Sequence, residues 1–313
     1  MSLAIIFNGQ GAQYKEMGQD FARTFPEARA VYEKIETLTN YPVRQWITDD
    51  FEALQETRYA QVAIAATSLA IYESIQAKLP AIDYMAGLSL GEYSSLIASG
   101  MLSLEEGFSL IKTRGQLMTN HCQTLRESSD IVMAAVMKMP LEEIQAVLKE
   151  VNKAEEKLYL ANLNSSTQVT IAGTTEAFNQ FKKIARTRGY KKIMPLKVEG
   201  PFHTPYMDAV CAPYDEALAP LSFSEGEVLV LSNTTVKPHQ TEKVKELLVR
   251  HLVEPVRWQE TIASMKTFGV TKIIQIGPGK TLANLLKREP EAPDTLVVDK
   301  VADVEEIEEF LGG

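Results

Sequence analysis

Ser89 is the residue best placed for covalent chemistry, because it is the centre of the turn Gly87-Leu88-Ser89-Leu90-Gly91. The turn follows an apolar run, Ile82 to Ala86, and precedes a helix-like segment, Glu92 to Ala98. A Gly-x-Ser-x-Gly turn between a strand and a helix holds its serine at strained backbone angles, so that the hydroxyl projects from the end of the sheet. The glycines are needed because a side chain at either place would collide with the neighbouring strand or helix. We therefore predict a nucleophile here; the alternative is a serine in an ordinary strand-to-helix loop.

A glycine-rich turn near the start of the chain offers free backbone N–H groups. The apolar run Leu3–Phe7 is typical of a buried parallel strand, and Asn8–Gln13 ends it with glycines on both sides of Gln10. Such a turn leaves N–H groups unpaired at the carboxyl end of the strand, where open α/β sheets bind ligands. One of these groups can stabilise an oxyanion; the alternative is a plain glycine turn.

Among the four histidines, His203 has the setting best suited to a general base. It lies in Gly200-Pro201-Phe202-His203-Thr204-Pro205, where two prolines and a glycine indicate a fixed loop. An imidazole held in this way can accept the proton of a serine hydroxyl. His121, His239 and His251 lack this setting. A structural loop histidine is the alternative interpretation of His203.

Arg114 places a cation on the apolar face of a helix. Ser103-Leu104-Glu105-Glu106 has the form of a capping box, which predicts a helix from there to about Met118. The neighbours of Arg114 at helical spacing are all apolar: Leu110, Ile111, Leu117 and Met118. A buried guanidinium needs an anionic partner, and its planar fork matches a carboxylate. The partner is either a substrate carboxylate or an acidic side chain of the protein, unless the side chain reaches the surface.

The composition excludes several classes of protein. With 313 residues, 45% of them hydrophobic and 23% charged, the chain is typical of a globular protein with a sizeable core. A net charge of -9 argues against nucleic-acid binding, and no apolar run reaches the length that spans a membrane. The two cysteines and the lack of a signal-peptide pattern favour the cytoplasm. The histidines lack metal-binding spacing, so we expect no metal site.

The order of elements predicts an α/β fold that carries an inserted unit. Four apolar runs are typical of buried strands: residues 3–7, 82–86, 228–231 and 272–276. From about residue 130 the elements become shorter and follow the order βαββαβ of a ferredoxin-like unit, with strands at 131–137, 158–162, 168–172 and 192–198 and helices at 141–151 and 176–187. We predict an α/β-hydrolase-like core with a parallel sheet in residues 1–127 and 199–313, and an inserted ferredoxin-like subdomain in residues 128–198.

Taken together, four motifs resemble those of the malonyl-CoA:acyl carrier protein transacylase family. They are Phe7–Gln13, Gly87–Tyr93, Arg114-Gly115 and Gly200–His203. The resemblance follows the order and spacing of that family from about Phe7 to Gly279, and it includes the inserted ferredoxin-like unit. It implies transfer of malonyl from coenzyme A to the phosphopantetheine thiol of acyl carrier protein, which supplies fatty acid biosynthesis.

The same resemblance implies a role for each matching residue. Ser89 would be the nucleophile and His203 its base. The backbone N–H groups of Gln10 and Leu90 would form the oxyanion hole, and Arg114 would clamp the malonyl carboxylate. These roles describe a double-displacement reaction through a malonyl-serine intermediate.

Four further positions complete the expected site. The main-chain carbonyl of His251 would orient the base, so that no acidic third member is needed. Asn162 and Asn164, near a hairpin turn, are candidates for hydrogen bonds to the substrate, although asparagines at turns are often structural. Phe202, beside the base, would leave little room for a branched substrate such as methylmalonyl. The resemblance implies malonyl-CoA and acyl carrier protein as partners and a coenzyme A thioester as substrate; we expect no cofactor and a monomer.

The chain departs from the family at Asn8, where proline is common, and at two positions near the site. Many members have histidine where this chain has Leu88, and glutamine is usual where it has His251. Since neither side chain is the expected base, we expect the chemistry to survive. The alternatives are a stand-alone acyltransferase or editing acyl hydrolase of polyketide biosynthesis, a serine hydrolase that uses water, and a module that only binds carrier protein.

Overall fold

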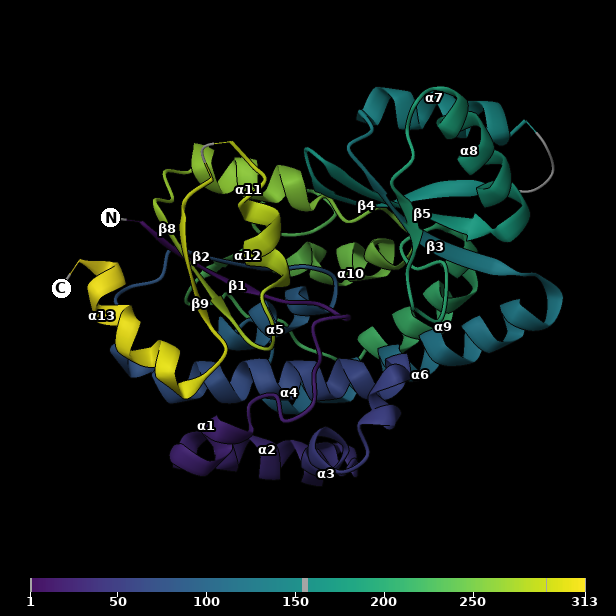
Figure 1. Cartoon of the computed structure of the whole chain (residues 1–313). Helices are drawn as coiled ribbons and strands as arrows, with labels where there is room; N and C mark the ends of the chain where they lie inside the picture. The colour runs from purple at the N-terminus through teal and green to yellow at the C-terminus, as the bar shows by residue number, and fades with distance from the viewer. Residues whose placement is uncertain (1, 154–156, 291, 313) are drawn as a thin grey trace.

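Two separate sheets with helices around them make up the chain in the computed structural model, which describes residues 2–153, 157–290 and 292–312. Figure 1 shows the larger sheet beside the N- and C-termini and the smaller sheet at the opposite end of the molecule. None of the helices in these ranges combines the length and the apolar character that crossing a membrane requires.

Five parallel strands form the larger sheet, in the order β7-β2-β1-β8-β9. They are β1 (Leu3–Phe7), β2 (Tyr84–Gly87), β7 (Leu229–Val230), β8 (Lys272–Ile276) and β9 (Asp294–Val298). The side chains of β1 alternate between two cores: Leu3, Ile5 and Phe7 join one cluster, and Ala4 and Ile6 join another. Because β1 is buried on both faces, its sequence is an uninterrupted apolar run.

Helices cover both faces of this sheet. The long helices α4 and α6 pack together along one face, with α1, α2 and α3 outside them at the bottom of Figure 1. Trp258 of α11 and Leu282 of α12 belong to the cluster on the other face. The α-helices around the sheet are α1 (Gln19–Thr24), α2 (Pro26–Thr39), α3 (Val43–Thr48), α4 (Thr57–Ile75), α5 (Leu90–Ala98), α6 (Leu104–Ser128), α9 (Asp208–Leu218), α10 (Val244–Val253), α11 (Trp258–Thr267), α12 (Thr281–Leu286) and α13 (Glu306–Leu311). Short 3-10 helices are η1 (Phe51–Gln55), η2 (Gln76–Lys78), η3 (Pro205–Met207), η4 (Thr241–Lys243) and η5 (Val301–Glu305).

The smaller sheet has four antiparallel strands in the order β4-β5-β3-β6. They are β3 (Ile131–Met137), β4 (Leu158–Ser165), β5 (Gln168–Thr174) and β6 (Ile193–Pro195). Helices α7 (Leu141–Val151) and α8 (Thr175–Thr187) lie together on one face, at the top right of Figure 1. The order β3, α7, β4, β5, α8, β6 is that of the predicted ferredoxin-like unit, so this part of the fold prediction is confirmed. The domain limits at 127/128 and 198/199 stay a prediction.

Some element bounds differ from those predicted. The helix expected to end near Met118 continues to Ser128, because the stretch from Thr119 onward contains neither glycine nor proline to stop it. Strand β6 covers only Ile193–Pro195 of the predicted 192–198, although the N–H of Leu196 still donates to the carbonyl of Met133 at 2.8 Å. Helix α9 was not predicted, because Pro213 lies inside it.

Three attachments between the smaller sheet and the rest of the molecule are made by the main chain, and side-chain hydrogen bonds, such as that from Arg288 to Gln168, add others. Helix α6 leads into β3, and residues 196–203 return from β6. The third attachment is a parallel bridge between Asn162 of β4 and Val256, which lies between α10 and α11. Here the N–H of Leu163 donates to the carbonyl of Val256 at 2.8 Å, and the N–H of Val256 donates to the carbonyl of Ala161 at 2.9 Å.

Candidate active site

Ser89 lies at a strained turn between β2 and α5. Its φ is 55° and its ψ is -104°, a conformation that non-glycine residues seldom adopt. The turn packs tightly against β1: a Cβ atom placed on Gly91 would lie 2.1 Å from the carbonyl oxygen of Phe7. Glycine is therefore required at this position, as the motif predicts.

His203 contacts Ser89 directly. Its Nε2 lies 2.7 Å from the Oγ of Ser89, and its Nδ1 lies 2.7 Å from the carbonyl oxygen of His251. A carbonyl oxygen can only accept, so Nδ1 carries the proton. In a neutral ring Nε2 is then the acceptor for the Ser89 hydroxyl. His203 also has a positive φ of 60°, so the loop holds it in a specific and strained conformation.

The surroundings of His203 keep its imidazole neutral. Burial, together with the positive charge of Arg114, lowers the pKa of His203 to about 3, although the hydrogen bond to His251 opposes the shift. Burial and the neighbouring His203 also hold the pKa of His251 well below its usual range. A neutral imidazole is the form that can accept a proton from Ser89.

Arg114 of α6 is a buried cation whose guanidinium reaches the same place. Only 1% of it is exposed. Its Nη1 donates to the Oε1 of Gln61 at 2.8 Å, and its Nη2 lies 3.4 Å from the Oγ of Ser89. The guanidinium carbon lies 5.1 Å from the ring centroid of Tyr93.

The described residues give Arg114 no acidic partner. Its Nε has no hydrogen-bond partner among them, and none of the ion pairs between described residues includes this side chain. The structural ion pair considered from the sequence is therefore not formed within the described chain, and burial excludes a surface position. A buried guanidinium in this state is suited to an anionic ligand.

Two backbone segments with free N–H groups meet beside Ser89. Leu90 is the first residue of α5, and the first N–H groups of a helix have no acceptor within it. A Cβ atom placed on Gly9 would lie 2.3 Å from the carbonyl oxygen of Leu88, so the loop that carries Gln10 abuts the serine turn. Asn8 fixes this loop from below, because its Nδ2 donates to the carbonyl of Pro278 at 2.7 Å. The structure thus brings Gln10 and Leu90 to the same edge of the sheet as Ser89.

A cavity of about 380 Å³ opens over Ser89 between the two sheets. All the residues whose side chains were predicted to act in the site line this cavity. Asn162 and Asn164 come from β4, and Phe202 lies beside His203. The Nδ2 of Asn164 donates to the Oγ1 of Thr170 at 3.1 Å, so this asparagine is partly engaged within the sheet. The lining residues are Gln10, Gly11, Gln61, Leu88, Ser89, Leu90, Arg114, Met118, Met133, Asn162, Asn164, Gln168, Thr170, Leu196, Lys197, Val198, Phe202, His203, Thr281 and Leu285.

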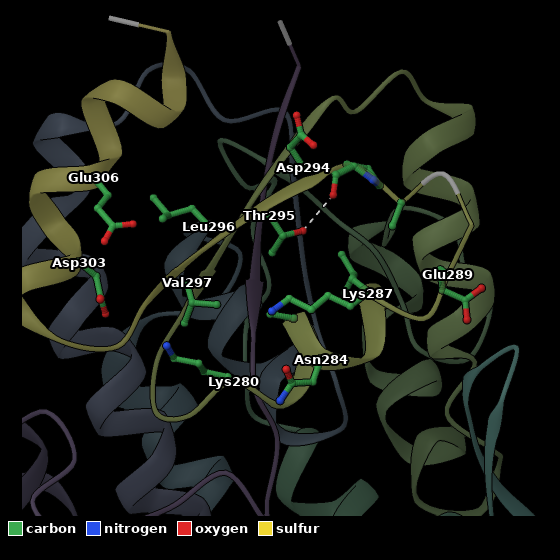
Figure 2. Close-up of a pocket in the computed structure, with 14 residues that line it drawn as sticks. Lys280, Asn284, Lys287, Glu289, Asp294, Thr295, Leu296, Val297, Asp303 and Glu306 are labelled. Atoms are coloured by element: carbon green, nitrogen blue, oxygen red, sulfur yellow. Dashed lines mark hydrogen bonds between the residues drawn. The ribbon is translucent and has the colours of Figure 1, made fainter. Parts of the chain in front are cut away.

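A second cavity, of about 500 Å³, lies between α12, β9 and η5. Figure 2 shows Lys280 and Asn284 in the lower part of the view, Lys287 near its centre, and Asp303 and Glu306 at the left. None of the predicted site residues lines it. No serine or histidine lines it, so it lacks the groups that the cavity over Ser89 offers for acyl transfer.

Three neighbours of the site were not predicted from any motif: Gln61, Glu92 and Asn233. Gln61 is a buried polar residue on the largely apolar α4, which is a signal of function. Asn233 follows β7 at the carboxyl end of the strand next to β2, where ligand-side residues of open α/β sheets lie. Glu92 directly follows the serine motif but gave no signal of its own. No cluster of His, Cys, Asp and Glu arranged for a metal ion occurs in the ranges that the structure describes.

This combination of an α/β sheet, a turn-held serine, a histidine and a buried arginine defines an acyltransferase site. The chain belongs to the acyl transferase domain family, whose family model matches residues 4–307. The resemblance inferred from the motifs is therefore confirmed, and so is the α/β fold with its second, antiparallel sheet.

Particular relatives are malonyl transacylases. The chain is 34% identical over 306 residues to the malonyl CoA-acyl carrier protein transacylase of Bacillus subtilis strain 168, across 97% of this chain and 95% of the relative. The crystal structure of MCAT from Streptococcus pneumoniae superposes with a TM-score of 0.92 at 35% identity, covering 98% of this chain and 99% of that one. A malonyl-transacylase solved in complex with its type II polyketide synthase acyl-carrier protein gives a TM-score of 0.92 at 30% identity, with 98% of each chain covered.

Proposed function

We propose that this chain transfers the malonyl group of malonyl-CoA to the phosphopantetheine thiol of acyl carrier protein, and so supplies fatty acid biosynthesis. One observation carries the proposal: a buried guanidinium without an acidic partner lies 3.4 Å from the hydroxyl of a histidine-bonded serine. A serine and a histidine serve any acyl transfer, but the adjacent fixed cation favours an acyl group that ends in a carboxylate.

In the first half-reaction, Ser89 becomes malonylated. The Nε2 of His203 takes the hydroxyl proton while Oγ attacks the thioester carbonyl carbon. The N–H groups of Gln10 and Leu90 hold the oxyanion of the tetrahedral intermediate. As the intermediate collapses, the carbon–sulfur bond breaks, and His203 returns the proton to the sulfur of coenzyme A.

In the second half-reaction, the phosphopantetheine thiol of the carrier is the nucleophile that accepts the malonyl group. His203 accepts the thiol proton, the sulfur attacks the malonyl-serine ester, and the carbon–oxygen bond to Ser89 breaks. The proton on Nε2 then passes to Oγ, which restores the enzyme. This sequence has ping-pong kinetics with a covalent intermediate.

Malonyl binding also makes His203 a stronger base. The charge of Arg114 is one cause of the low pKa of His203 in the empty site. A malonyl carboxylate paired with Arg114 cancels much of that charge, so the pKa of His203 rises when the correct substrate is bound. An acyl group without a carboxylate leaves the base weak.

We also propose the cofactor requirement, the location and the oligomeric state of this chain. The site uses a coenzyme A thioester as substrate and needs no cofactor, because every proton and acyl transfer is covered by Ser89, His203 and backbone groups. Both cysteines are free thiols, which supports a reducing cytoplasmic location. We also propose that the chain acts as a monomer, since the cavity over Ser89 is complete within one chain.

A stand-alone acyltransferase of polyketide biosynthesis is the second candidate. The similar malonyl-transacylase solved with a type II polyketide synthase carrier supports it. The two candidates share the chemistry at Ser89 and differ in the carrier that accepts the malonyl group. Transfer rates to a fatty acid carrier and to a polyketide carrier, measured side by side, separate them.

Intact-protein mass spectrometry tests the proposal directly. The wild type and Ser89→Ala are mixed with malonyl-CoA or acetyl-CoA, and holo acyl carrier protein is then added. We expect a malonyl adduct on the wild type alone, discharged by the carrier. Fast release of free malonate without a carrier would favour an editing or serine hydrolase, and the absence of both adduct and malonate would favour a module that only binds the carrier.

A further inference from the structure

Glu92 is a buried carboxylate that the proposed reaction does not use. It lies in the first turn of α5, and only 1% of it is exposed. It does not line the cavity over Ser89, so it does not reach the substrate. A carboxylate in such a place is costly unless hydrogen-bond donors surround it.

The groups around the Glu92 carboxylate come from two segments. The Nε2 of His239 lies 2.6 Å from Oε1, and since an ionised carboxylate only accepts, the imidazole is the donor. The backbone N–H of Asn233 donates to Oε2 at 3.3 Å. The Nδ1 of His251 lies 3.2 Å from the same oxygen. Glu92 therefore connects the loop after β7, which carries Asn233 and His239, with α10, which carries His251.

The first of these connections leads to the nucleophile. The Oδ1 of Asn233 accepts from the N–H of Ser89 at 2.8 Å, and its Nδ2 donates to the carbonyl of Gly87 at 2.7 Å. One asparagine side chain thus holds the serine turn on both sides of Leu88. Because Ser89 has a strained positive φ, its conformation depends on such external support.

The second connection leads to the base. The carbonyl of His251 accepts from the Nδ1 of His203, and the two imidazole rings stack with centroids 4.9 Å apart and an angle of 27° between their planes. A shift of His251 would move both the acceptor and the ring face that hold His203. The side chain of His251 in turn packs against Glu92.

We propose that Glu92 is a positioning residue that sets the geometry between Ser89 and His203. One carboxylate accepts a hydrogen bond from the backbone N–H of the asparagine that supports the nucleophile, and it packs against the histidine that orients the base, so both reacting groups depend on the same buried group. The inference rests on the proposed function, because it concerns the rate at which Ser89 is malonylated.

The test measures the single-turnover rate of Ser89 malonylation together with steady-state kcat and KM. Glu92→Gln keeps the shape of the side chain but offers only one acceptor oxygen to its donors, and Glu92→Ala removes both. Displacement of reacting groups by a fraction of an ångström is costly, so we expect the malonylation rate of Glu92→Gln to fall between about tenfold and a hundredfold, with the KM for malonyl-CoA changed by less than about threefold. The malonylation rate of Glu92→Ala should fall at least as far as that of Glu92→Gln. If Glu92→Ala does not fold, the result for Glu92→Gln alone decides the test.

Val147→Ala is the matched control for a general loss of stability. Val147 is buried in the core of the smaller sheet and contacts none of the residues in this network. The substitution leaves a cavity there, and we expect the malonylation rate to stay within about twofold of the wild type.

A double variant tests whether Glu92 acts through Asn233. If it does, the losses of Glu92→Gln and Asn233→Ala are less than multiplicative in the combined variant. Multiplicative losses, a Glu92→Gln rate equal to that of Val147→Ala, or a loss expressed only in KM would each overturn the inference. A wild type that forms no malonyl-serine overturns the proposed function instead, so the two failures are distinguishable.

Discussion

The Nη2 of Arg114 and the Oγ of Ser89 lie 3.4 Å apart, although Arg114 lies in α6, Ser89 lies in the turn before α5, and 25 positions separate them in the sequence. The guanidinium reaches the serine from α6 while Gln61 of α4 holds its other nitrogen. The fixed cation thus lies close enough to the Oγ of Ser89 to contact the far end of a short acyl group attached to that atom.

Arg114→Ala is expected to remove most of the preference for malonyl-CoA. A charge-assisted pair with a carboxylate contributes about 1.5 to 3 kcal/mol, so kcat/KM for malonyl-CoA should fall between about tenfold and a few hundredfold. The value for acetyl-CoA should not fall, because loss of the Arg114 charge also raises the pKa of His203. Arg114→Lys should be intermediate because it keeps the charge without the planar fork. The measurement is kcat/KM for both substrates, with Arg126→Ala at the exposed end of the same helix as the control. Equal losses for the two substrates would contradict the role of Arg114.

The pKa of His203 predicts an unusual pH dependence of activity. Since burial lowers this pKa to about 3, the ring stays neutral well below the usual value near 6.5, and kcat/KM should not fall between pH 8 and pH 5 through protonation of His203. The measurement is the rate of Ser89 malonylation at low malonyl-CoA. A loss of activity with a midpoint near 6.5 would show that the base of the reaction does not have a lowered pKa.

The same pKa predicts a loss of stability in acid. The unfolded state binds a proton at His203 below about pH 6.5, whereas the folded state does so only near pH 3, so the free energy of unfolding falls as the pH drops through this window. At pH 5 the contribution of this one group is about 2 kcal/mol. Urea unfolding at pH 7.5 and pH 5 should show a smaller acid loss for His203→Gln than for the wild type. An identical loss in both proteins would rule out His203 as a source of the effect.

Phe202→Ala is expected to widen the acyl cavity. Phe202 is buried beside His203 and lines the cavity, so the ring takes up space that a branched acyl group would need. One methyl group in a pocket is worth about 1 to 3 kcal/mol, and kcat/KM for methylmalonyl-CoA relative to malonyl-CoA should rise by about tenfold or more. Phe268→Ala, at an exposed position, is the control. Equal use of both substrates by the wild type would be incompatible with this role.

Gly91→Ala is expected to destabilise the protein and disturb the serine turn. The new Cβ would meet the carbonyl of Phe7 at 2.1 Å, and relief requires movement of backbone in β1 or α5. We expect a loss of about 3 kcal/mol in the free energy of unfolding, together with slower malonylation. Gly189→Ala is the comparison, because its φ of 93° is strained but no atom lies within 4 Å, so about 1 kcal/mol should be lost there. Similar losses at the two positions would mean that the close contact with Phe7 is relieved without cost.

The parts of the fold that were predicted from the sequence are those with local signals. The serine turn has glycines that its backbone requires, and the apolar run of β1 reflects burial on both faces. The inserted unit was recognised because its short elements alternate in a fixed order. Helix α9 was not predicted. Pro213 lies inside it, and proline normally disfavours the interior of a helix, but packing against α6 and α10 outweighs this preference.

The supporting residues of the site could not be predicted in the same way. Glu92, Asn233 and His251 are far apart in the sequence, and each would be unremarkable alone. Their importance comes from hydrogen bonds that exist only when β2, β7 and α10 are packed together. The carbonyl of His251 is a further case, since a backbone group leaves no trace in the residue type, and only the resemblance to a family indicated it.

The bridge between Asn162 and Val256 affects how the enzyme selects the size of the acyl group that it binds. Rotation of the smaller sheet about its two chain connections would break the backbone hydrogen bonds that Leu163 and Ala161 make with Val256. The bridge therefore holds the two walls of the cleft in position relative to each other, with Asn162 on one wall and Ser89 on the other. Because the bridge opposes a change in the width of this cleft, the distance between its two walls and the position of the Arg114 charge limit which acyl groups fit.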